Sequence, residues 1–93
     1  MKKIFKYSLQ LTSTQTVPMQ KGAKILSMKV MGCGLCAWAM VENDSGIPLV
    51  SRGITMHRTG EIVSDPDATF IGTAVDGRTS PPLVWHVFDV GEV

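Results

Sequence analysis

Charged residues are scarce in this sequence. Asp, Glu, Lys and Arg make up 18% of its 93 residues, and the formal net charge is +1; soluble domains average roughly 25% charged residues. This balance argues against both a nucleic-acid-binding protein, which usually has a dense basic face, and a strongly acidic DNA mimic. We therefore predict no direct nucleic-acid partner, and we expect another chain to cover part of the surface.

Long apolar runs are also missing. No segment approaches the roughly 18 apolar residues that a membrane helix needs. Residues 1–7 carry the charge of a signal peptide, but Ser8 and Gln10 interrupt the apolar stretch that should follow. The sequence thus predicts no membrane association and a cytoplasmic location, where its two cysteines stay reduced.

Helical periodicity is absent as well, and alternation with a period of two takes its place. The length predicts one domain spanning residues 1–93. Residues 12–23 look like a polar connection that contains Pro18, and Leu26, Met28 and Val30 are expected on one face of their strand. The pattern favours an all-β fold, a small antiparallel sandwich or barrel of about six strands. These strands are expected at residues 5–11, 25–31, 35–41, 49–58, 69–75 and 83–90.

The strand at residues 35–41 is apolar on both faces, one of which carries Cys36, Trp38 and Met40. Since a strand of a small domain usually has one wet face, either it is central and covered on both sides or this face meets a second chain. We predict a homo-oligomer, most simply a two-fold dimer, with these three residues in the interface.

Cys33 and Cys36 form a C-x-x-C pair. With His57 and His86 they could supply the four ligands of a zinc site, but these histidines are far apart in sequence. A redox pair would need a helix after it to lower the thiol pKa, whereas Cys36 opens a strand. We expect neither a metal nor a cofactor.

Arginines supply the candidate ligand site. Arg52 and Arg58 share a strand, and Arg78 lies beside Thr79 in the last loop. Arginines with hydroxyls recognise phosphate or carboxylate groups, and Trp85 could stack on a base. His86, the next residue, is either a neutral core residue or part of this site.

Five short stretches, in order along the chain, carry a resemblance to a known family. They are residues 4–9 (IFKYSL), 22–27 (GAKILS), 36–41 (CAWAMV), 70–73 (FIGT) and 83–89 (LVWHVFD). On these stretches the chain resembles a family of small proteins encoded by tailed bacteriophages and prophages. The resemblance implies a viral origin and a cytoplasmic, β-rich domain, and it implies no catalytic residues. The family pattern does not supply a cysteine at position 33, which counts against the zinc interpretation.

Small phage accessory proteins commonly act by binding. We predict a non-enzymatic counter-defence inhibitor that binds a host bacterial protein stoichiometrically in the host cytoplasm, through an apolar patch. The alternative is a sponge that sequesters a nucleotide immune signal, such as a cyclic dinucleotide or an ADP-ribose derivative. A small nucleotide-cleaving enzyme is the third hypothesis, and no nucleophile–base pair in the sequence supports it.

Overall fold

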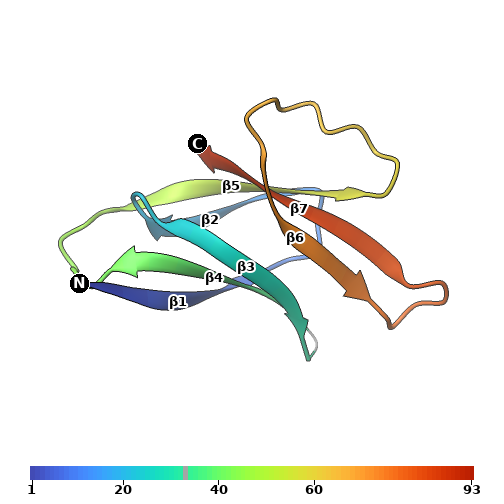
Figure 1. Cartoon of the computed structure of the whole chain (residues 1–93), viewed down its shortest axis with the longest axis horizontal. Helices are drawn as coiled ribbons and strands as arrows, with labels where there is room; N and C mark the ends of the chain where they lie inside the picture. The colour runs from blue at the N-terminus through green and yellow to red at the C-terminus, as the bar shows by residue number, and fades with distance from the viewer. Residues whose placement is uncertain (33) are drawn as a thin grey trace.

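The predicted all-β fold is confirmed. The computed structural model describes residues 1–32 and 34–93, and these residues form seven strands and no helix (Figure 1). None of them belongs to a helix that could span a membrane. The strands are β1 (Lys2–Leu9), β2 (Thr14–Gln20), β3 (Lys24–Met31), β4 (Gly34–Glu42), β5 (Leu49–Arg58), β6 (Thr69–Asp76) and β7 (Leu83–Glu92).

The strands form two antiparallel sheets. Sheet A has the order β1-β4-β3, and sheet B has the order β2-β5-β7-β6. The sheets approach most closely where β3 meets β6 (Figure 1). There a Cβ on Gly72 would lie only 3.2 Å from Sδ of Met28, so the absence of a side chain permits the contact.

The core lies between the sheets. On β4 the residues Leu35, Ala37, Ala39 and Val41 are all buried, and they face Met19, Ile54, Met56 and Val87 of sheet B within one cluster. β4 is therefore the central strand of its sheet, with one face in the core. Its other face points outward, where Cys36 is buried among its neighbours and Trp38 and Met40 are half-buried.

The prediction of a polar connection over residues 12–23 was wrong, because these residues contain β2. Val17 and Met19 of this strand are buried. Pro18 made the segment look irregular, but β2 is an edge strand of sheet B that pairs with β5 alone. An edge strand tolerates proline, since one side of its backbone has no partner to bond.

The predicted faces of β3 were partly wrong because this strand contains a β-bulge. A bulge between Ile25 and Ser27 shifts the register, so that Ile25 and Met28 both pack on the core while Leu26 is exposed. One extra residue on one strand reverses the alternation beyond it. The bounds of β5 agree with the sequence, whereas β1 starts and ends earlier than expected and β7 continues to Glu92.

Candidate binding surfaces

Arg52, expected to bind a ligand, is held inside the protein. Its Nε and Nη2 donate to the two carboxylate oxygens of Asp89, each at 2.9 Å, and its Nη1 donates to the carbonyl oxygen of Ala23 at 2.7 Å. The two side chains are 12% and 15% exposed. Because β5, β7 and the start of β3 all depend on this guanidinium, Arg52 fastens the two sheets together.

Arg78 is similarly engaged, in the turn between β6 and β7. Its main-chain N–H and its Nε donate to Oδ1 of Asp76, and its Nη2 donates to Oδ2, at distances of 2.9 to 3.0 Å. These bonds lower the pKa of the Asp76 carboxyl to about 2. The Thr79 hydroxyl donates within the same turn, to the carbonyl oxygen of Pro81 at 2.9 Å. Arg78 and Thr79 thus shape the turn.

Arg58 and Trp85 are the two predicted ligand residues that the structure brings together. The Arg58 guanidinium lies 5.0 Å from the centre of the Trp85 ring, which is 8% exposed. A shallow hollow of about 260 Å³ borders Arg58, Thr59 and Leu83. Arg52 lies six residues away along β5, about 20 Å for an extended strand, so Arg52 and Arg58 do not converge on one ligand.

The two histidines are cross-strand neighbours on the outer face of sheet B. The ring nitrogens of His86 lie 2.8 Å from the Thr59 hydroxyl and 3.1 Å from the Thr73 hydroxyl. Cys36 lies on sheet A, on the opposite side of the sandwich, so it cannot share a metal ion with them. Cys33, its partner in the C-x-x-C pair, lies outside the described residues.

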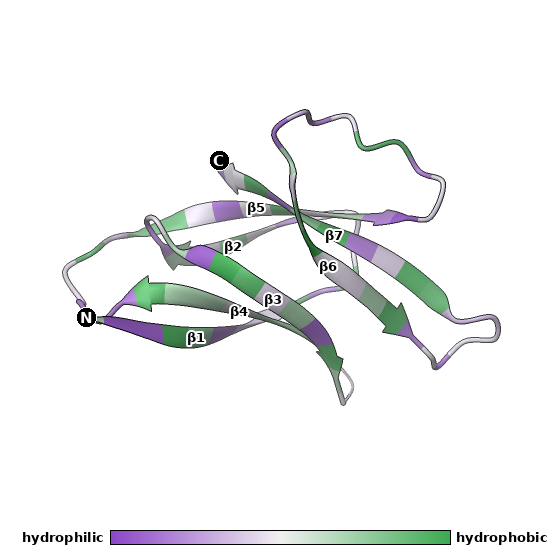
Figure 2. Cartoon of the chain, viewed as in Figure 1, coloured by the Kyte–Doolittle hydropathy of each residue, from purple (hydrophilic) through white to green (hydrophobic). Residues whose placement is uncertain are grey.

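A mixed basic and apolar surface covers the outer face of sheet A. Cross-strand partners share a face, and the register pairs Ile4 with Met40 and Lys6 with Trp38. On the other side of β4, Lys24 pairs with Met40 and Ser27 with Trp38. Purple and green segments alternate along β1 and β3 in Figure 2, in agreement with this mixture. We call this surface the lysine-framed face: Ile4, Trp38 and Met40 in the centre, with Lys2, Lys6, Lys24 and Lys29 around them.

The lysine-framed face is positively charged although the whole chain is nearly neutral. Its four lysines stand against one carboxylate, that of Glu42, whose Oε1 lies 3.4 Å from the Lys2 ammonium. The apolar centre is accessible, since Ile4 is 60% exposed. The sequence indicated the apolar part of this face, but the lysines came together only through the pairing of β1 and β3 on either side of β4.

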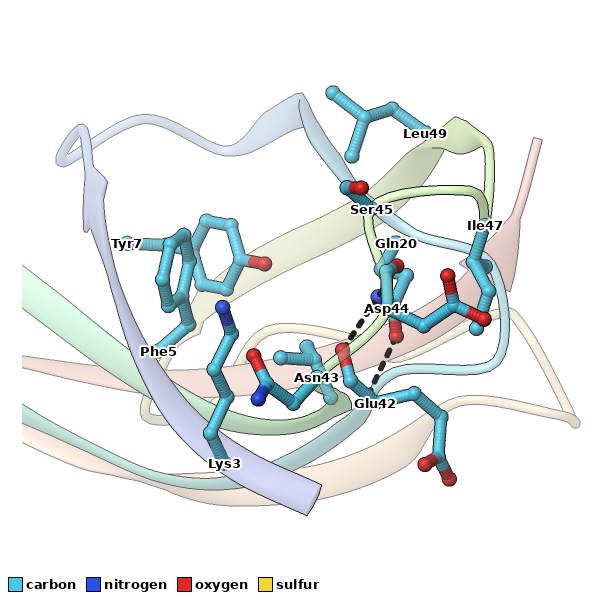
Figure 3. A pocket seen from close by; sticks show the side chains of 11 residues that line it. Lys3, Phe5, Tyr7, Gln20, Glu42, Asn43, Asp44, Ser45, Ile47 and Leu49 are labelled. Atoms are coloured by element: carbon cyan, nitrogen blue, oxygen red, sulfur yellow. Dashed lines mark hydrogen bonds between the residues drawn. The ribbon is translucent and has the colours of Figure 1, made fainter. Parts of the chain in front are cut away.

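An open cleft lies between the sheets beside β1, and the sequence did not indicate it. Its volume is about 470 Å³. Phe5 and Tyr7 form one wall and the segment 43–49 forms another, with Lys3 running alongside Phe5 (Figure 3). The Lys3 ammonium lies 5.1 Å from the centre of the Phe5 ring, and Tyr7 packs edge-on against that ring.

A glutamine at the end of β2 lines the cleft and joins the two sheets there. The Gln20 side chain accepts a hydrogen bond from the Glu42 N–H at 2.7 Å and donates one to the Glu42 carbonyl at 2.8 Å (Figure 3). It also lies 3.4 Å from the Asp44 carbonyl oxygen. This amide replaces a missing strand neighbour and fixes sheet B to the end of β4, which sets the position of the 43–49 wall.

Comparison with known proteins places the whole chain in one family. Residues 1–93 match the domain of unknown function DUF7352. No curated protein and no solved structure matches the chain.

Proposed function

The chain belongs to the DUF7352 family, and we propose that it is a non-enzymatic binding protein whose lysine-framed face docks onto an acidic protein surface. The resemblance to phage-encoded proteins suggests the setting: a counter-defence inhibitor that masks a host bacterial protein in the cytoplasm of an infected cell. The observation that carries the proposal is the apolar centre inside a ring of lysines, where Ile4 is exposed and Trp38 and Met40 are half-buried.

An apolar centre with a charged rim is typical of a protein–protein interface. Aromatic residues near the centre of a patch supply most of the binding energy once water is excluded around them. Charged residues at the rim steer the approach of a partner of opposite sign and add specificity. Trp38 is therefore the expected anchor, and the lysines select a partner with aspartates and glutamates around an apolar pocket.

The charge also bears on the predicted homodimer. A two-fold dimer built on this face would place the patch against itself, and the four lysines of one copy would meet the four of the other. Like charges opposed across an interface cost several kcal/mol. The charge pattern therefore favours a foreign acidic partner for this face, and a homo-oligomer would have to use another surface.

A nucleotide sponge is the second candidate, favoured by Arg58 over Trp85 beside the hollow at Thr59. Arg52, however, is held by Asp89 inside the protein, and the exposed Arg78 pairs with Asp76 in its own turn. At this hollow a phosphate ligand would therefore depend on Arg58.

The test compares variants in capture of bacterial proteins from lysate, followed by affinity measurement with the purified target. We expect Trp38→Ala to weaken binding by on the order of 2 kcal/mol, roughly 30-fold. Lys6→Glu should also weaken binding, and the loss should increase as the salt concentration is lowered. Fewer ions then screen the repulsion between the new carboxylate and the acidic partner. Phe70→Ala is the matched control, since Phe70 is 56% exposed on the other sheet.

Two results would contradict the proposal. Capture that survives Trp38→Ala but is lost with Arg58→Ala would move the docking surface to the hollow at Arg58. Capture that is lost after nuclease treatment would identify a nucleic acid as the partner instead of a protein.

A further inference from the structure

Among the residues that the structure describes, β1 is a long edge strand whose backbone pairs with β4 on one side and with no strand on the other. It pairs with β4 in an unbroken register from Lys2 to Leu9, and sheet A ends there. An edge of this length presents unpaired N–H and C=O groups to any extended chain, and proteins usually blunt such edges with prolines, bulges or charges. β2, the neighbouring edge of sheet B, contains Pro18, whereas β1 relies on its lysines alone.

The inter-sheet cleft opens directly on the inner side of this edge. Phe5 of β1 points to that side and is nevertheless 49% exposed, while Leu49 across the cleft is 69% exposed. Apolar surface is thus uncovered on both walls of the cleft. A side chain entering the cleft would bury both residues, and the volume of about 470 Å³ lies within the roughly 300–1,000 Å³ typical of ligand sites.

We infer that the edge of β1 and this cleft together take an extended peptide segment of the partner, added to sheet A as a further strand. Strand addition derives affinity from main-chain hydrogen bonds and specificity from pockets for alternate side chains. The inference deepens the proposed function, because it assumes that the partner is an acidic protein and names the mode of attachment.

The two sides of β1 determine the sequence pattern of the segment. Side chains of an added strand alternate between faces, as those of β1 do. One set would enter the cleft beside Phe5 and Lys3, and the other would lie on the lysine-framed face beside Lys2 and Lys6. The segment that fits is therefore apolar at every second position and acidic at the positions between.

A second copy of β1 does not fit this description. Each copy would bring Lys2, Lys3 and Lys6 and no acidic residue of its own strand, and like charges across a strand pair are destabilising. Charge complementarity therefore assigns the edge to a foreign acidic strand.

The probe is a synthetic eight-residue peptide in which glutamate alternates with valine and phenylalanine. We expect it to bind and to slow hydrogen exchange at alternate amides of β1. N-methylation of the alternate set of amides that faces β1 should abolish binding, because it removes the donors of an added strand, whereas the other alternate set does not pair with β1. A peptide of the same composition with the glutamates in one block should bind at least tenfold more weakly.

Variants of the protein locate the site. Phe5→Ala should weaken the alternating peptide about tenfold or more, whereas Phe70→Ala should leave it unchanged. Both phenylalanines are about half exposed and pack edge-on against one other aromatic ring, so they are closely matched. Lys3→Gln should weaken the peptide less than Phe5→Ala.

Binding that survives N-methylation of each alternate set of amides in turn, or protection by the peptide of amides outside β1, would overturn the inference. Exchange protection of β1 that rises with protein concentration alone would identify a second copy as the occupant. Failure of the peptide together with capture of a partner through Trp38 would reject strand addition and leave the proposed function intact. Peptide binding at β1 with capture that is independent of Trp38 would reject the docking role of the lysine-framed face.

Discussion

Replacing Arg52 by alanine should be among the most destabilising single changes in this protein. The substitution leaves the Asp89 carboxylate, 15% exposed, without its bidentate partner, and the Ala23 carbonyl without its donor. Asp89 would keep the hydrogen bond that its Oδ1 accepts from the Gly91 N–H. One retained bond does not replace the charge that is lost.

The magnitude follows from the geometry. Removing one partner of a buried ion pair costs about 3–5 kcal/mol, because an uncompensated charge remains in a poorly solvated place. We take the lower end, about 3 kcal/mol, since both side chains keep some contact with water. For a domain of this size that corresponds to a fall in Tm of roughly 12–24 °C.

Urea unfolding followed by tryptophan fluorescence measures this loss, and Arg58→Ala is the control. Arg58 lies on the same strand but is exposed, so its loss should change the free energy of unfolding by about 1 kcal/mol or less. Exchanging both partners for apolar residues, as in Arg52→Met with Asp89→Leu, should recover much of the loss. If Arg52→Ala proved as stable as the wild type, the pair would be dispensable for folding and Arg52 would again be a candidate for ligand binding.

Three further changes test other parts of the fold. The wild type should lose stability as the pH falls from about 3.8 to about 2, because Arg78 holds the pKa of Asp76 at about 2 in the folded state while the unfolded group titrates near 3.8. Asp76→Asn should abolish this loss. Urea midpoints at several pH values compare the two proteins, and identical profiles would refute the prediction. Gly53→Ala would place a Cβ 2.5 Å from a valine methyl of β7 and should cost about 1–3 kcal/mol, whereas the unobstructed Gly34→Ala should cost less in the same assay. Gln20→Ala removes the two hydrogen bonds to β4 and should cost about 1–3 kcal/mol; faster hydrogen exchange at the end of β4 should accompany it, and unchanged exchange there would show that the clamp is not needed.

The fold could be predicted where burial and alternation agree. β5 was predicted to the residue, at residues 49–58. β2 was missed because its two buried side chains, Val17 and Met19, flank a proline. Proline argues against a central strand, but only the sheet order reveals that this strand is at an edge.

The candidate site was less predictable than the fold. Whether an arginine or a lysine is available to a ligand depends on which carboxylates and strands lie beside it in the folded protein. Arg52 and Arg78 have the same local signals as anion-binding arginines, yet Asp89, 37 residues from Arg52, and Asp76 occupy them. The cleft depends on β1, β4 and the segment 43–49 meeting between two sheets. A local sequence pattern does not predict that these distant segments lie side by side.

Arginine and lysine have different roles in this protein, and the difference connects the fold to the proposed function. Arginine suits internal pairing because its planar group meets a carboxylate with two bonds at once, as Arg52 does with Asp89. Lysine keeps its charge strongly hydrated, so a ring of lysines costs little in the free protein and attracts an acidic partner from a distance. Two lysines of that ring, Lys2 and Lys6, lie on β1, so the free edge of β1 borders the ring. The same lysines that repel a second copy of the strand would thus admit an acidic one, which is why strand pairing and charge select the same partner.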